Sequence, residues 1–475
     1  MKVSKQRYSD AQVTDQNSLS AALLQNPAKI SSVLTFLGGR EDERFPLTML
    51  TEGAGNTESI NKYEYEYDVM DRVDRVRPVA KTPTPDTNLG KGNSRFKLTF
   101  PDKWFVKDYN IVSQSGVQCR IMEEPVSVGT GYEYTLEIAN SNPQEAVPAS
   151  DVQAGAQWGQ MFAAVGTDWS RGNAHNFSTP FKIRHKITKV RKSYQMAGSA
   201  KDYVADIELP TSGGGTTNLW MPFEEWQFML DWKMEMEMLY WYGEQSYDEN
   251  GNTTVLDERG QPVNIGPGLF QQIVNKDTYS VLTEDKLKNI IGDLFYGMTD
   301  NQNRQVTLYT GQGGMREFDR AMKDYVGSQN YIKDTNENRF ITGSGRNLSI
   351  TGYFTTYEHV DGHTVNVVKA PLFDHGPVAD TRPRHPETGW SLESYRMCFV
   401  DQSNYEGEPN LFMINKSGEE MKKWAVSGST VPPGFPEGNG LRANDIDGAA
   451  VHFLKTSGIL LRRFDTSLDL QCVAQ

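Results

Sequence analysis

The clearest periodic pattern in the chain is helical and covers residues 222–242, where large apolar side chains recur on almost every side. With 3.6 residues per turn, these side chains form two stripes on opposite sides of the predicted helix. The stripes consist of Phe223, Trp226, Leu230, Met234 and Trp241, and of Met229, Trp232, Met236, Leu239 and Tyr240. Other elements must cover a helix this apolar, so we predict a central packing helix about 31 Å long at 1.5 Å per residue. Its six charged residues argue against a membrane span.

Both ends of this helix carry sequence signals. Pro222 suits the first helical turn, and Gly243 suits a left-handed residue just beyond the last turn. A narrow acidic strip, Glu224, Asp231 and Glu235, is left to face water or a basic partner.

Alternation of apolar and polar residues before the helix predicts strands. The strictest case is 62–69, with Tyr63, Tyr65, Tyr67 and Val69 on one face and Glu64, Glu66 and Asp68 on the other. Further β-rich segments are predicted at 95–100, 104–112, 117–122, 132–138, 158–169, 181–187 and 203–209. Residues 1–58, by contrast, resemble an arm, because their amphipathic segment at 19–37 is too short to bury a core of its own. The arm must lie against this chain or another copy.

Two turn signals after the helix, Asn250-Gly251 and Arg259-Gly260, predict a polar hairpin at 247–264. A second helix is predicted between the N-cap Thr283 and Gly297, because its apolar residues recur at the spacing of one buried face. These residues are Leu287, Ile290, Ile291, Leu294 and Phe295.

A strand, a turn and a helix then follow one another in the order typical of a small α/β domain. The predicted segments are a strand at 305–309, a helix at 315–326, strands within 340–369, loops at 374–390 and 430–440, and strands at 451–454 and 459–470. Ser457-Gly458 is predicted to turn the chain between the last two.

Composition and charge narrow the class of protein. The chain of 475 residues has a mean hydropathy of -0.59, which is expected of a soluble protein with two or three domains. No secretory signal is recognisable, and three scattered cysteines fit neither a disulfide framework nor a thiolate metal site. We therefore expect synthesis in a reducing cytoplasm. The net charge of -13 gives the whole chain no attraction for nucleic acid.

Two short motifs could carry chemistry, but each has a simpler structural interpretation. Gln312-Gly313-Gly314 is placed like a phosphate-binding loop, yet the P-loop lysine is absent and Arg316 replaces the third glycine of GxGxxG. We favour a tight turn between strand and helix. His359, Asp361 and His363 could meet at a metal, but the Asp-Gly turn explains the same residues.

Residues 246–257 nearly follow the spacing of a calcium-binding loop. Ser246 stands where the first aspartate belongs, and Asp257 stands where the bidentate glutamate belongs. We favour a polar hairpin tip and leave open whether it binds a cation.

One local basic patch stands out in this acidic chain. Lys182, Arg184 and Lys186 project from one face of a predicted strand, and Lys189, Arg191 and Lys192 extend it. The patch could contact nucleic acid phosphates, but an acidic strip such as Glu224, Asp231 and Glu235 on a neighbouring copy is at least as good a partner. We therefore suspect that these two sets of residues meet between subunits.

Motifs for catalysis are missing from the sequence. There is no nucleophile elbow, zinc-protease helix or cysteine-protease signature, and nothing selects a glycosidase pair from the 61 acidic residues. We therefore expect no enzyme activity and no catalytic, cofactor-binding or metal-binding residues.

The order of these parts resembles a known family. An arm and a β-rich excursion precede the long helix, whose end reads Leu-Tyr-Trp-Tyr-Gly at 239–243, and a hairpin, Pro-Gly-Leu-Phe at 267–270, an α/β region and terminal strands follow. In this layout, from about Tyr63 onward, the sequence resembles the major capsid proteins of tailed bacteriophages with the Hong Kong 97 fold, in particular those of crAss-like phages.

The resemblance implies an α+β fold of the Hong Kong 97 type with the domains of that family. Residues 1–58 would be the N-terminal arm, 59–94 the start of the P-domain and a connector, and 95–180 an extended β-rich E-loop with an inserted subdomain. The P-domain would hold 181–282, with the spine helix at 222–242 and the hairpin at 247–264, and the terminal strands of 446–475. Residues 283–445 would form an α/β A-domain.

The resemblance also implies a structural protein that self-assembles, as hexamers and pentamers, into the icosahedral head of a virion. It would be made in the bacterial cytoplasm and enclose double-stranded DNA with only weak, non-specific contact. Decoration proteins, a portal and a scaffold would be further partners, with no membrane and no cofactor. Two other classes stay open: a β-rich carbohydrate-active enzyme or depolymerase, suggested by the Trp and Tyr content, and a minor virion protein of the tail or the decoration.

Overall fold

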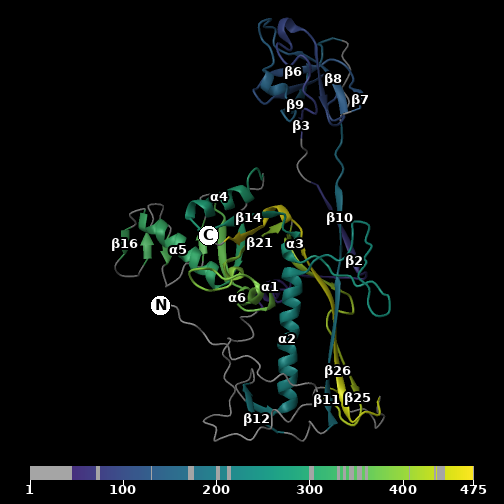
Figure 1. Ribbon diagram of the computed structural model, residues 1–475, viewed down its shortest axis with the longest axis vertical. Coiled ribbons are helices and arrows are strands. Elements are labelled where there is room, and N and C mark those ends of the chain that lie inside the picture. Colours follow the sequence, from purple (N-terminus) through teal and green to yellow (C-terminus); the bar gives the residue numbers. More distant parts are fainter. Residues whose placement is uncertain are drawn as a thin grey trace. The chain divides into compact units, whose positions relative to one another are not determined.

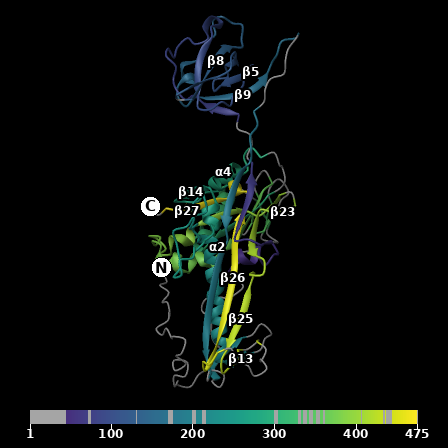
Figure 2. The same ribbon diagram turned by 90° about the vertical axis from the view of Figure 1, so that its right-hand side faces the viewer.

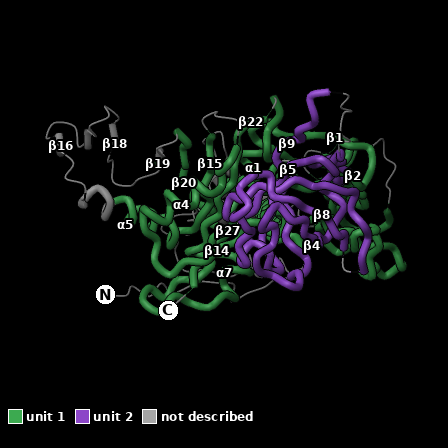
Figure 3. Tube along the Cα trace, turned by 90° about the horizontal axis from the view of Figure 1, so that it is seen from above, with its two compact units in different colours: residues 1–65, 184–475 green, residues 66–183 purple. Residues whose placement is uncertain are grey.

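The computed structural model describes most of the chain from residue 45 to residue 473, so the predicted segment at 19–37 lies outside the described residues. Also outside are 71–74, 130, 169–175, 199–203, 211–215, 299–303, 329–331, 335–338, 342–346, 350–355, 359–361, 406, 433–434 and 436–443. The chain divides into two compact units, green and purple in Figure 3. Unit 1 comprises 1–65 and 184–475, and unit 2 comprises 66–183.

The longest helix of unit 1, α2 (Trp220–Tyr242), runs along a long sheet (Figures 1 and 2). The strands of this sheet are β1 (Thr57–Ile60), β24 (Leu411–Lys416), β26 (Gly448–Leu461) and β11 (Thr188–Ala197) in spatial order, with β25 (Lys422–Ser427) also paired to β26. Trp232, Met236 and Tyr240 of α2 are buried in one core with sheet residues such as Phe453 and Ile459. The predicted packing helix is therefore confirmed.

Gly243 ends α2 for a different reason from the one predicted. Its backbone is not left-handed. A side chain there would place its Cβ 2.6 Å from the carbonyl oxygen of Leu239 and 2.9 Å from that of Gly266. Because the chain passes so closely at the start of α3 (Leu269–Gln272), only glycine fits.

The predicted turn at Ser457-Gly458 is wrong, because β26 runs through both residues as one strand of 14 residues. Ser457 lies opposite Thr188 of β11, and its hydroxyl lies 2.7 Å from the hydroxyl of Tyr240 in α2. A Cβ at residue 458 would lie 3.2 Å from Cγ2 of Ile187. Glycine therefore allows close packing in a strand here and does not reverse the chain.

The second sheet of unit 1 has parallel and antiparallel pairs, as expected of a mixed α and β region. Its strands in spatial order are β14 (Asn275–Tyr279), β27 (Leu468–Cys472), β21 (Met397–Asp401), β15 (Gln305–Thr310), β20 (Thr364–Lys369) and β19 (Thr356–Glu358). Helices α4 (Glu284–Leu294) and α5 (Gln312–Ser328) share its core. The predicted cap of α4 is confirmed, because the Thr283 hydroxyl accepts from the backbone of Lys286 at 3.3 Å.

Residues 374–390 were expected to be a loop but contain one helical turn and lie between two others. Pro371 and Pro377 each stand at the start of one, where a missing N–H costs nothing. The elements are α6 (Pro371–Asp374) and α7 (Pro377–Thr381), followed by the 3-10 turn η6 (Leu392–Tyr395).

Unit 2 is built around one antiparallel sheet with its own aromatic core. Its strands in spatial order are β3 (Val76–Pro78), β9 (Gln157–Ala163), β5 (Tyr109–Ser113), β6 (Gln118–Ile121), β8 (Gly131–Ile138) and β4 (Phe96–Phe100), with β7 (Val126–Val128) beside β8. Phe100, Phe105 and Tyr134 pack edge to face, with ring centroids 5.0–5.9 Å apart. Trp158 is fully buried beside them.

The boundary between the units falls within a two-stranded ribbon of β2 (Glu64–Val69) and β10 (Phe181–Lys186). The predicted alternation of β2 is confirmed, since its acidic residues are exposed and Tyr65, Tyr67 and Val69 are half-buried. Smaller sheets pair β12 (Val204–Pro210) with β13 (Thr216–Leu219), β22 (Asn404–Tyr405) with β23 (Glu408–Pro409), and β16 (Ile332–Asp334) and β18 (Asn347–Ser349) with β17 (Arg339–Ile341). Among the described residues, no helix is long and apolar enough to cross a bilayer.

Substitution of Gly243 tests the close approach at the end of α2. We expect Gly243→Ala to lower the free energy of unfolding by about 1–3 kcal/mol, since the added methyl group meets two carbonyl oxygens. The matched control is Gly292→Ala in α4, where a Cβ meets nothing within 4 Å and should stabilise the helix by about 0.5–1 kcal/mol. Urea unfolding monitored by tryptophan fluorescence measures both. Equal effects from the two substitutions would refute the steric explanation.

Candidate functional site

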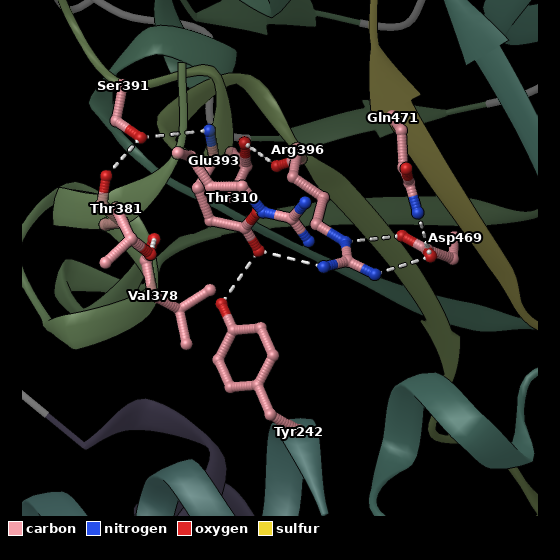
Figure 4. Close-up of polar contacts among 11 residues, drawn as sticks. Tyr242, Thr310, Val378, Thr381, Ser391, Glu393, Arg396, Asp469 and Gln471 are labelled. Atoms are coloured by element: carbon pink, nitrogen blue, oxygen red, sulfur yellow. Dashed lines mark hydrogen bonds and ion pairs between the residues drawn. The ribbon is translucent and has the colours of Figure 1, made fainter. Parts of the chain in front are cut away.

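A buried cluster of charged side chains lies where the last turn of α2 meets the second sheet of unit 1 (Figure 4). Arg396, just before β21, donates to both carboxylate oxygens of Asp469 in β27, at 2.7 and 2.6 Å. Its third nitrogen donates to Glu393 of η6 at 2.8 Å. Glu393 in turn accepts from the hydroxyl of Tyr242, the last residue of α2, at 2.8 Å.

The cluster is saturated with partners. Arg396, Glu393 and Asp469 have side chains 8%, 5% and 0% exposed, so each charge depends on the others for solvation. Burial would lower the pKa of Arg396, but its bonds to Asp469 and Glu393 raise the pKa above the ordinary value. The guanidinium also lies 3.4 Å from the ring centroid of Phe270 in α3. Each of the three guanidinium nitrogens donates to a carboxylate, so the cluster acts as a structural joint.

A second buried carboxylate anchors α1 (Pro46–Thr51), the first described helix, to α2. Glu237 is fully buried and accepts from the backbone nitrogens of Leu47 and Thr48 at 3.0 and 3.1 Å and from the Thr48 hydroxyl. Burial raises the pKa of Glu237 while these bonds lower it, and the net shift is upward. A carboxylate at the amino end of α1 also complements the helix dipole.

The other end of α1 is held as well. Lys455 of β26 donates to both carboxylate oxygens of Glu52 at 2.7 Å, and Leu47 is fully buried in the core around α2. The part of the predicted arm that the structure describes therefore lies against its own chain.

The suspected basic contact residues lie in β10 and have partners within the chain. Lys182 pairs with Glu66 at 3.0 Å, and Lys186 donates to the carbonyl of Gly251 at 2.6 Å. Arg184 is exposed between them. The extension of the patch along β11 divides between two faces, because Lys192 points to α2 while Lys189 and Arg191 point away.

The acidic strip on α2 is only partly open. Glu235 pairs with Lys192 of the same chain at 2.5 Å, so one predicted basic residue meets one predicted acidic residue within a single copy. Asp231 is exposed, and its pKa is raised by burial of the carboxyl and by Glu235, against the attraction of Lys192. The side chain of Glu224 lies outside the described residues.

The glycine motif at 312–314 holds no phosphate cradle. Residue 311 alone connects β15 to α5, which confirms the tight turn but starts the helix at Gln312 and not at 315. Backbone nitrogens at the start of α5, which have no partner within the helix, donate to side chains instead. Gln312 donates to Asp374 at 2.7 Å, and Gly313 donates to the Ser394 hydroxyl at 2.8 Å. An anion would have to displace the Asp374 carboxylate.

The two suspected metal motifs have structural roles where they are described. In the hairpin, Asp248 accepts from the backbone nitrogens of Asn250 and Asn252 at 3.0 and 2.7 Å, which uses its carboxylate to shape the turn. His363 accepts from the backbone nitrogen of Arg304 at 3.2 Å, while His359 and Asp361 lie outside the described residues. Within the described ranges, no group of three His, Cys, Asp or Glu side chains could hold a metal ion.

Sequence patterns missed the two residues that matter most in these clusters. Arg396 lies in a loop segment, and Glu237 is one of several acidic residues on α2 with nothing local to mark it as buried. Their partners are 73 and 190 positions away in the chain, so only the folded structure reveals them. Both clusters join elements of unit 1 that are far apart in the sequence.

Comparison with known proteins gives the family. The model of the family described as Crassvirus major capsid protein matches residues 2–474. The major capsid protein of Bacteroides phage crAss001 is 24% identical over 480 residues, covering 94% of this chain and 93% of the phage protein. The chain therefore belongs to the Crassvirus major capsid protein family, as its layout predicted.

Among solved structures, the chain is similar to the capsid of a native GTA particle, with 8% identity and a TM-score of 0.37 over 98% of this chain and 100% of the other. It is also similar to the capsid of Cyanophage P-SCSP1u, with 9% identity and a TM-score of 0.33 over 66% and 81% of the two chains. The encapsulin of Synechococcus elongatus shares 8% identity and a TM-score of 0.33 over 62% and 76%.

The Arg396 cluster can be tested by removing its charge. We expect Arg396→Met to lower the free energy of unfolding by about 3–5 kcal/mol, because Asp469 and Glu393 lose the cation that solvates them. The matched control is Arg320→Met in α5, whose pair with Glu317 is half exposed and should contribute less than about 1 kcal/mol. Urea unfolding compares the two, and a loss at Arg396 no larger than at Arg320 would contradict the structural role.

The α1 anchor can be tested through Glu237. Glu237→Leu leaves two buried backbone nitrogens without an acceptor, so we expect a loss of about 3 kcal/mol and faster proteolysis near residues 45–56. Glu237→Gln keeps a carbonyl acceptor and should fall between this variant and the parent. Glu235→Gln, on the same helix, should leave the cleavage rate unchanged. If all three variants are cut at the parental rate, α1 is not held by this carboxylate.

Proposed function

We propose that copies of this chain assemble through hexamers and pentamers into an icosahedral head that encloses double-stranded DNA. The observation that carries the proposal is the family match over residues 2–474. The named relative of comparable length is itself a major capsid protein, which supports a structural, non-enzymatic role in the virion. Portal, scaffold and decoration proteins are the further partners this role requires, and the host bacterial cytoplasm is the expected place of synthesis.

We also propose that the described fold corresponds to the domains of a Hong Kong 97-type subunit. Unit 2 contains all of 95–180, the segment assigned to the extended E-loop. Helix α2 and the long sheet beside it correspond to the P-domain, with 1–58 as its N-terminal arm. The second sheet, with α4 and α5, corresponds to the A-domain, assigned to 283–445. Its strands β14 and β27 lie outside that range, and β24 and β25 of the long sheet lie within it.

The residues suspected at subunit contacts remain part of this proposal. Partners within the chain already bind three of them, Lys182, Lys186 and Glu235. A residue of a neighbouring copy would therefore add to an existing interaction at these positions. Arg184 and Asp231 are exposed and are further candidates for contacts between copies. Exposed charges of this kind contribute more to the specificity of a contact than to its affinity.

Several exposed apolar side chains support association between copies. Phe177 is 84% exposed and Tyr296 is 88% exposed, and contact with another copy would remove this apolar surface from water. Burial of such aromatic surface is the common source of stability at protein interfaces.

Expression of the full chain tests the proposal. We expect negative-stain microscopy to show closed shells, alone or with a scaffold, and sedimentation to place most of the protein in them. Rings or isolated trimers without shells would favour a tail or decoration protein. Discrete particles that cleave polysaccharide, with the activity lost on replacing one carboxylate, would favour the carbohydrate-active enzyme.

A further inference from the structure

The hairpin after α2 has a fixed shape and projects its tip into solvent. We call residues 247–263 the acidic hairpin. Asp257 accepts from the backbone nitrogens of Arg259 and Gln261 at 2.8 Å, as Asp248 does at the other turn. At its base, the Tyr247 hydroxyl accepts from the backbone nitrogen of Lys186 at 2.7 Å. The shape is therefore set before any partner binds, which lowers the entropy cost of docking.

The acidic hairpin carries both charge and exposed apolar surface. Its ionisable residues are Asp248, Glu249, Asp257, Glu258 and Arg259. Glu249 and Glu258 are exposed and pair with no cation among the residues that the structure describes. Between the two turns, Val255 and Leu256 are 45% and 57% exposed. The hairpin thus presents an apolar pair flanked by unpaired carboxylates.

A second surface has the opposite character. We call Arg191, Lys422, Trp424 and His452, on three adjacent strands of the long sheet, the outer sheet face. Trp424 lies opposite His452, and their rings stack with centroids 5.2 Å apart. The guanidinium of Arg191 lies 5.3 Å from the Trp424 ring centroid. An aromatic platform therefore lies beside a cation.

This face is turned away from α2. Lys192 and Lys423, which neighbour Arg191 and Lys422 in sequence, both point to α2, where they pair with Glu235 and Glu225. Because alternate residues of a strand face opposite sides of a sheet, Arg191 and Lys422 point the other way. In the described part of the chain, neither of these two has a carboxylate partner.

We propose that the acidic hairpin of one copy docks on the outer sheet face of a second copy. The inference rests on the proposed self-assembly and names one contact within it. Glu249 and Glu258 complement Arg191 and Lys422, while Val255 and Leu256 supply apolar surface for Trp424. The two surfaces differ, so the contact is heterologous and can link copies head to tail into a ring.

A second copy explains this face better than nucleic acid does. Its unpaired cations are few, and the chain as a whole carries a net charge of -13. Nucleic acid binding depends on many phosphate contacts made together. A short, preformed acidic segment needs only the two cations and the aromatic ring that the face provides.

Charge exchange tests the contact. Arg191→Glu with Lys422→Glu, or Glu249→Lys with Glu258→Lys, should each raise the protein concentration needed for half-maximal assembly by about tenfold. All four changes together should restore assembly to within about threefold of the parent, since the pairs re-form with opposite sign. The outer-face variant alone should keep its DNA content. If it assembles normally but loses DNA, the face binds nucleic acid and the proposal is wrong.

Cysteine cross-linking separates this contact from self-assembly in general. In a Cys472→Ser background, Leu256→Cys combined with Ser193→Cys should give a ladder of linked chains from oxidised particles on a non-reducing gel. Ser193 lies beside the outer sheet face, opposite His452, whereas the matched control pairs Leu256→Cys with exposed Thr278→Cys of β14 and should give no ladder. Shells without the ladder would overturn the docking proposal and leave the capsid role intact. A parent chain that forms no shells would overturn both.

Discussion

The last turn of α2 is the constraint on which unit 1 depends. Trp241 is fully buried, with its ring centroid 5.1, 5.2 and 5.0 Å from those of Phe270, Tyr309 and Phe373. These three residues belong to α3, β15 and α6, so one side chain packs against the helix that follows, the second sheet and the turn beside that sheet. Tyr242 then reaches the Arg396 cluster. A shift of this turn would disturb all of these elements together, because packed cores do not deform gradually.

The buried charges of this chain join elements that are far apart in the sequence. Burial of a charged group is tolerated only when hydrogen bonds replace its solvation. Each guanidinium nitrogen of Arg396 and each carboxylate oxygen of Glu237 has at least one such bond. A hydrophobic replacement of the same shape would fill the space without these directional bonds. The hydrogen bonds of the charged groups instead fix which elements meet. Glu237 sets where α1 begins, and Arg396 sets how β27, η6 and α2 meet.

Local patterns predicted the elements far better than the contacts. The periodicity of α2, the alternation of β2 and the cap at Thr283 are all confirmed, because each depends on residues a few positions apart. The roles of two glycines were predicted wrongly, because their actual role is to leave room for a neighbouring segment. Gly243 lies against the backbone of Gly266, and Gly458 lies against Ile187. The pair of Lys192 with Glu235 could not be predicted either. The sequence showed a basic set and an acidic set of residues, but not that two of their members meet within one copy.

The length of β26 has a mechanical consequence. At about 3.3 Å per residue this strand extends for about 46 Å, hydrogen-bonded to β11, β24 and β25 along its course, and α2 runs beside it for about 34 Å. A helix bonded within itself and a strand bonded on both edges resist bending in different directions. Bending the pair would therefore strain the hydrogen bonds of three neighbouring strands and the core beneath α2 together.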